Sequence, residues 1–309
     1  MNTQSNTLPE SFEAQTAASP ALTAVRSMYW SIRRELWESR SIYIAPLAAA
    51  VVFLLGFLIS MVRLPQKMRA LSALDPAHQR EAIAMPYDMA AGLLMLTAMI
   101  VGMFYCLGAL QGERRDRSIL FWKSLPVSDL TAVLSKASIP FVVLPLLTFA
   151  ITVATQWIML LLSTVVLWAN GLNAATLWTP LSFFQMSLLL LYHLVTVHAL
   201  WQAPIYSWLL LISAWSRRAA FLWAALPLLA IGAVERLVFN TRHFTAMLEK
   251  RFSGGGAEAL TMPGTFPMNP MTHLTPGTYL SSSGLWIGLL FTALCLAAAV
   301  RLRRYRGPI

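Results

Sequence analysis

The chain has 309 residues, of which 57% are hydrophobic and only 12% are charged, and its formal net charge is +10. Several apolar runs exceed the roughly 18 residues that mark a transmembrane helix, which excludes an ordinary soluble domain. These runs take up most of the length and leave no room for a separate catalytic domain. The basic residues form no soluble face interleaved with aromatic residues, so nucleic acid is excluded as a partner.

The first residues are polar and are rich in Ser, Thr, Gln and Ala. They contain no basic region followed by an apolar one, so we expect residues 1–24 to be a disordered cytosolic tail rather than a cleaved signal. Residues 25–309 are predicted to form a single domain. Cys106 and Cys295 lie inside apolar runs, where a cysteine ordinarily behaves as a small buried hydrophobe.

Hydropathy predicts an all-α integral membrane protein with six spans. These are residues 42–62, 89–110, 139–168, 181–215, 221–239 and 285–300. The fourth run is long enough to suggest a hairpin, but each arm would have about 17 residues, and a crossing needs about 20. We therefore expect one helix, bent near Pro204, whose ring and missing N–H disturb the helix.

The distribution of Lys and Arg predicts the orientation, because cytoplasmic loops carry an excess of both. With six spans, one side collects 15 basic residues and the other 7, and Arg236 lies within span five. The richer side holds both chain ends. We therefore expect a multi-pass protein of a bacterial inner membrane with both termini in the cytoplasm.

The most polar stretch, GERRDRSILFWKSLPVSDL, lies between the second and third spans at residues 112–130. Residues 114–125 contain no helix breaker, and charges alternate with apolar side chains, which predicts a short amphipathic helix. Pro126 ends this helix, and Ser128 is a good N-cap for the next one. Such a helix is often only an interfacial segment lying on the bilayer.

Residues 112–129, followed by VLSKA, closely resemble the cytoplasmic segment between spans two and three of ABC-2 type transporter permeases. Residues 27–47 are similar to the amphipathic elbow helix of that family, and residues 199–227 to its span four, basic turn and span five. The resemblance implies that residues 111–138 are a coupling segment that docks on a separate ATP-hydrolysing subunit. The implied contact residues are Glu113, Arg114, Asp116, Arg117, Ile119, Phe121, Trp122, Lys123 and Pro126, with a secondary cytosolic contact at Arg217 and Arg218.

The family assembly implies two permease copies, identical or related, two ATPase subunits and a substrate moved outward through surrounding lipid. No G-x-x-x-x-G-K-[ST] loop occurs in this sequence. We therefore expect ATP and Mg²⁺ to bind the partner subunit, and this chain to bind no cofactor or metal and to be no enzyme itself.

Two rival classes remain. A stand-alone secondary transporter predicts broken helices and ionisable residues near the midplane, and a membrane hydrolase needs a catalytic constellation that the histidines do not provide. The candidates for a translocation path or an outer gate are His193, Trp201, Gln202, Glu235 and Arg236. Glu235 and Arg236 equally suit snorkelling to the interface, and Trp201 suits a packing stripe. In the outer segment, residues 240–284, the first part can continue span five as an amphipathic helix.

Overall fold

The computed structural model describes residues 20–71, 75–120, 128–178, 183–252 and 276–306, and every regular element within these ranges is helical. Six of the helices are long and apolar enough to cross a membrane. For the described residues, the all-α class and the expected number of helices long and apolar enough to span a membrane are therefore confirmed, and the chain has the character of a multi-pass membrane protein.

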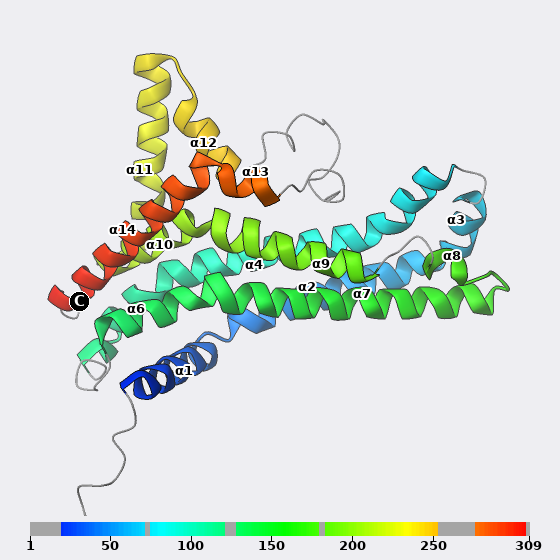
Figure 1. Cartoon of the computed structure of the whole chain (residues 1–309), viewed down its shortest axis with the longest axis horizontal. Coiled ribbons are helices and arrows are strands. Elements are labelled where there is room, and N and C mark those ends of the chain that lie inside the picture. The colour runs from blue at the N-terminus through cyan, green and yellow to red at the C-terminus, as the bar shows by residue number, and fades with distance from the viewer. Residues whose placement is uncertain (1–19, 72–74, 121–127, 179–182, 253–275, 307–309) are drawn as a thin grey trace, which may run out of the picture.

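One helix precedes the first span and another separates the first two spans (Figure 1). Helix α1 (Pro20–Glu38) begins inside the predicted tail and leads into α2 (Ser41–Met61), and α3 (Leu64–Leu71) precedes α4 (Pro76–Arg115). With 40 residues, α4 is about 60 Å long, roughly twice the hydrocarbon thickness of a bilayer. The expected second span, residues 89–110, thus lies within a longer helix that continues beyond it at both ends.

The third span is a continuous rod of α6 (Asp129–Ser138), the π-helical turn η2 (Ile139–Val143) and α7 (Leu144–Ala169). Its start was correctly predicted: the Ser128 hydroxyl accepts the backbone N–H of Thr131 at 3.0 Å. The π-turn coincides with Pro140, which has no N–H to give to the helical ladder.

The fourth span is one bent rod, as expected, and not a hairpin (Figure 1). After the short α8 (Ala175–Trp178), α9 (Phe183–His193) and the π-helix η3 (Leu194–Trp201) run up to a break at Gln202, beyond which α10 (Ala203–Trp215) continues. Pro204 lies in the first turn of α10, where its missing N–H costs nothing.

The fifth span departs from expectation at its outer end. Helix α11 (Ala220–Val234) and the π-turn η4 (Glu235–Phe239) end at Asn240, whose φ of 50° is left-handed. The chain then reverses, and α12 (His243–Phe252) returns beside α11 (Figure 1). The prediction that residues 240–252 extend span five is therefore wrong, because a left-handed residue ends the helix first. Helices α13 (Pro276–Ser281) and α14 (Ser283–Tyr305) complete the chain.

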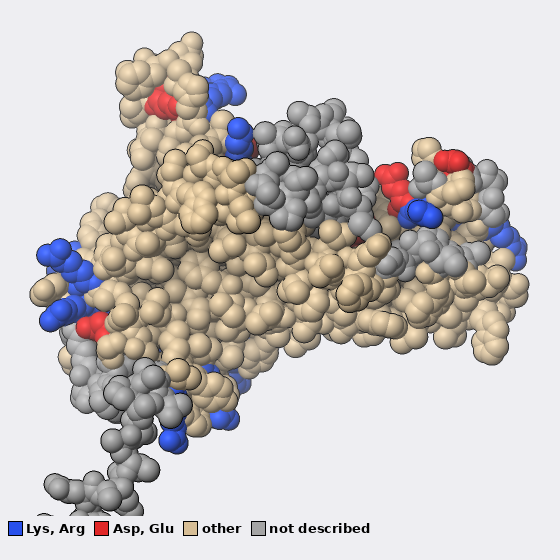
Figure 2. Space-filling model, viewed as in Figure 1, with Lys and Arg blue, Asp and Glu red and all other residues tan. Residues whose placement is uncertain are grey.

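One end of the bundle brings together α1, the end of α4, the start of α6 and the last turns of α14; we call it the junction end (Figure 1). The largest apolar core lies beside it, around the buried side chains Leu144, Tyr206 and Leu210. Cys106 and Cys295 are free and buried, as predicted. Figure 2 shows the charged side chains gathered towards the extremities of the molecule, while the middle of the visible face carries almost none.

Candidate functional site

A buried cluster of charges lies at the junction end, with Glu113 at its centre. Glu113 is in the last turn of α4 and is only 4% exposed. Its carboxylate accepts from Arg34 of α1 at 3.1 Å and lies 3.2 Å from the Lys136 ammonium of α6. It also accepts from the Arg303 guanidinium of α14. One carboxylate therefore binds cations from three other helices.

A second carboxylate, Glu35 of α1, completes the inner part of the cluster. It accepts from Lys136 at 2.7 Å and from the Tyr105 hydroxyl of α4 at 2.8 Å. Glu35 and Lys136 are 3% and 2% exposed. An ammonium and a carboxylate as deeply buried as these are stable only as partners, because each alone would carry a large desolvation cost.

Asp129 extends the cluster to the start of α6, where it accepts from the Nε of Arg303 at 3.2 Å. We call the whole set the ionic junction; its members are Arg34, Glu35, Glu113, Asp129, Lys136 and Arg303. Three formal positive charges balance three negative ones. The ionic junction thus ties α1, α4, α6 and α14 together at one end without a net charge.

The structure places two predicted partner contacts inside the chain instead. Glu113 belongs to the ionic junction, and Arg114, 5% exposed, donates to the carbonyl oxygens of Ala214 at 2.8 Å and Ser216 at 3.2 Å. Arg114 thereby caps the last turn of α10 with a cation, where the helix dipole favours one. Both side chains are bound within the chain in this structure, and their assignment as contacts with a partner stays a prediction.

The expected helix over residues 114–125 begins later than predicted. Helix α4 runs on to Arg115, Asp116 caps it, and Arg117 has a left-handed φ of 57°. Helical residues resume at 118–120, where Ile119 is buried at 1% exposed and Leu120 is 57% exposed. Asp116 and Arg117 are exposed, whereas Ile119 belongs to the interior.

Four other predicted contacts, Phe121, Trp122, Lys123 and Pro126, lie outside the described residues. Arg217 and Arg218 are exposed in the turn between α10 and α11, and the neighbouring Ala219 is left-handed with a φ of 52°. This turn lies at the junction end because Arg114 and Arg306 both donate to backbone carbonyls at the end of α10.

Two of the candidates for a translocation path meet at the break in span four. Trp201 is 8% exposed and lies under the guanidinium of Arg251, 4.2 Å from its ring centroid. Gln202 accepts from the Tyr206 hydroxyl at 3.0 Å. His193 lies eight residues before Trp201 and is half-buried, and its Nδ1 finds no partner among the described residues. Trp201 and Gln202 both make contacts within the chain, so neither side chain is free to line a translocation path.

The charges of span five have separate surroundings. Glu235 accepts from the Thr241 hydroxyl and from the Phe244 backbone N–H, both at 3.1 Å. Phe244 is in the first turn of α12, where helical N–H groups need an outside acceptor, so Glu235 caps the returning helix. Arg236 is exposed, which suits snorkelling.

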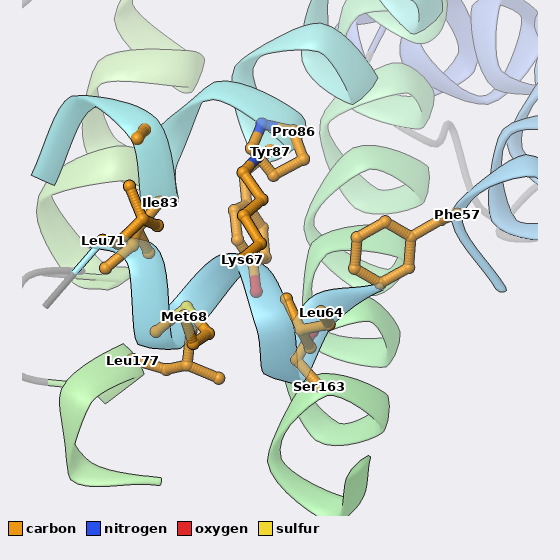
Figure 3. A pocket seen from close by; sticks show the side chains of 11 residues that line it. Phe57, Leu64, Lys67, Met68, Leu71, Ile83, Pro86, Tyr87, Ser163 and Leu177 are labelled. Carbon is orange, nitrogen blue, oxygen red and sulfur yellow. The ribbon is translucent and has the colours of Figure 1, made fainter. Parts of the chain in front are cut away.

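A small cavity lies at the far end from the ionic junction, between α2, α3, α4, α7 and α8 (Figure 3). Apolar side chains such as Phe57, Met68 and Leu177 line it together with the stem of Lys67 and the ring of Tyr87. Its volume is about 40 Å³, whereas ligand pockets measure roughly 300–1,000 Å³. The cavity is therefore far smaller than a typical pocket for a small-molecule ligand. Within the described ranges no group of three His, Cys, Asp or Glu side chains could hold a metal ion.

Sequence reasoning missed Glu35 and the pairing role of Arg34, Lys136 and Arg303. A signal was present for Glu35, since it lies beside Ile32 and Leu36 on the helix face that packs against the core. A carboxylate on an apolar face requires a cation, and Lys136 lies just before an apolar run. No family model matches the chain, and neither a curated protein nor a solved structure matches it.

Proposed function

We propose that this chain is the membrane-spanning permease subunit of an ATP-driven exporter, with ATP and Mg²⁺ bound by a separate ATPase subunit that docks on the connection between α4 and α6. The ionic junction is the observation that carries the proposal. It binds both ends of that connection, Glu113 before it and Asp129 and Lys136 after it, to α1 and α14.

This arrangement suits the transmission of force. A partner that displaces the connection also displaces α1, α4, α6 and α14, because separating a buried ion pair costs about 3–5 kcal/mol. A connection held only by exposed ion pairs would move without displacing these helices, since such pairs contribute at most about 1 kcal/mol. On the connection itself, the surface available to the partner is narrower than the sequence predicted and, among the described residues, consists of Arg115, Asp116, Arg117 and Leu120.

Co-purification tests the docking surface. The full chain is co-expressed with the proposed ATPase subunit and purified through a tag on the ATPase. Asp116→Arg reverses an exposed charge at the proposed contact, and Asp75→Arg makes the same change at an exposed position before α4. The proposal predicts that the native chain and the Asp75 variant are retained and that the Asp116 variant is lost. Equal retention of both variants contradicts docking at this surface.

A stand-alone secondary transporter is the second candidate, and two observations favour it. Three of the spans contain π-helical segments, and span four is broken at Gln202, as in transporters whose discontinuous helices form a midplane site. Asp88 of α4 is a half-buried carboxylate inside a spanning helix, where ionisable groups commonly serve a pathway. In proteoliposomes without ATP, proton uptake that Asp88→Asn abolishes would favour this candidate, and its absence would favour the exporter.

A further inference from the structure

The regular α-helical bonding pattern ends at the break in span four, and backbone carbonyls there also accept bonds from other elements. A π-helix and a bend interrupt the regular bonding pattern between Leu194 and Gln202. Two of these carbonyls accept bonds from the outer segment. The Tyr279 hydroxyl donates to the Thr196 carbonyl at 2.6 Å, and Arg251 donates to the Trp201 carbonyl at 3.0 Å. Burial raises the pKa of Tyr279 to about 12, so its hydroxyl keeps the proton that it donates.

Arg251 makes contacts on several sides at once. Its guanidinium stacks on the Trp201 ring, 4.2 Å from the centroid, and also donates to the Gly284 carbonyl of α14. In return, the Trp201 indole donates to the Lys250 carbonyl at 3.0 Å. The last turn of α12 is thus bound to span four and to span six by the same two residues.

A glycine pair makes room for this guanidinium. Gly284 and Gly288 form a G-x-x-x-G pattern in α14, which in membrane helices usually admits a second helix. Here Arg251 occupies the space beside it: a Cβ on Gly288 would lie 2.5 Å from the Arg251 Nη2 atom. A Cβ on Gly284 would lie 3.6 Å from the Trp201 ring. We call the space beside Gly288, which the Arg251 guanidinium occupies, the Gly288 slot.

We propose that Arg251 is a latch between α12 and the break in span four, so that span four can change its bend only when Arg251 leaves the Gly288 slot. Helix α12 and the fourth span then move together. The inference is independent of the ATPase partner, because it concerns contacts within this chain alone.

Hydrogen–deuterium exchange of the full chain in lipid nanodiscs tests the latch. Arg251→Gln removes the guanidinium, whereas Gly288→Ala displaces it without altering any polar group. Gly56→Ala is the matched control, since a Cβ there meets nothing within 4 Å. We expect both latch variants to speed exchange by about tenfold in residues 243–252 and in residues 194–202, since a desolvated cation–π contact has roughly this strength. The control is expected to leave both segments unchanged.

The coupling is the decisive result. Faster exchange in only one of the two segments, or in neither, overturns the proposal, because a latch must release both. The same change in Gly56→Ala as in Gly288→Ala also overturns it. Should Arg251→Gln fail to fold, Gly288→Ala decides the matter by itself, because it keeps the arginine.

Discussion

Replacing Glu113 by Gln tests the ionic junction most severely, because it keeps the shape of the side chain and removes its charge. Glu113 meets Arg34 at 3.1 Å, Lys136 at 3.2 Å, and Arg303. Within the ionic junction the variant would leave three buried or half-buried cations with two carboxylates, Glu35 and Asp129, a net charge of +1. Outside it, the exposed Glu38 also pairs with Arg34 at 3.3 Å. Removing one member of a buried ion pair costs about 3–5 kcal/mol, so we expect the free energy of unfolding to fall by about 3 kcal/mol or more.

The assay is thermal unfolding of the detergent-solubilised chain, compared at one heating rate because unfolding of such proteins is often irreversible. At about 2–4 °C per kcal/mol, the expected loss lowers Tm by about 6–12 °C. Glu81→Gln is the matched control at an exposed position of the same helix. The double variant Glu113→Gln with Arg303→Gln restores neutrality and should lose less than the sum of the two single changes. Additive losses, or a loss no larger than that of the control, would refute the reasoning.

Three further substitutions have definite expected costs in the same unfolding assay. Ser128→Ala removes the acceptor for the Thr131 N–H and should cost about 1 kcal/mol, with Ser128→Asn largely retaining it. Tyr105→Phe leaves one oxygen of the buried Glu35 carboxylate without its donor and should cost about 1–3 kcal/mol; a cost near zero would mean that water reaches this carboxylate. Gly102→Ala would place a Cβ 3.1 Å from the nearest tyrosine ring atom of α10 and should cost about 1–3 kcal/mol through overpacking, whereas Gly108→Ala, with open space around it, should cost nothing.

Features that depend on local sequence were predicted well. The six spans follow from run length and hydropathy, and the Ser128 cap and the bend before Pro204 follow from single residues acting on their own turn. The two buried cysteines follow from their apolar surroundings. In each case the determining interaction lies within a few residues along the chain.

Features that depend on distant partners were not predicted from the sequence. Glu113 and Arg114 look like surface charges in a polar stretch, but their partners lie far away in the sequence. The partners of Glu113, for example, include Arg34, 79 residues away, and Arg303, 190 residues away. Likewise, the slot for Arg251 on α14 cannot be distinguished in sequence from a helix-packing motif. A charge pattern shows that a residue needs a partner, and only the fold shows which one.

The orientation in the membrane and the binding of an ATPase stay predictions, and both concern the connection between α4 and α6. The first and last described helices, α1 and α14, both reach the junction end, as six spans require, and this end carries the basic residues Arg303, Arg304 and Arg306. If the positive-inside rule holds, the exposed surface of Asp116, Arg117 and Leu120 faces the cytoplasm, where an ATPase has access to it.

The most direct test of the account is the ATP hydrolysis rate of a purified complex of this chain with the proposed ATPase subunit in lipid nanodiscs, measured for the native chain and for Glu113→Gln. The account predicts that both chains bind the ATPase, because Glu113 is buried away from the docking surface, and that the variant changes the hydrolysis rate because the ionic junction no longer transmits the displacement. An identical rate in the two complexes, or no ATPase bound to the native chain, would contradict it.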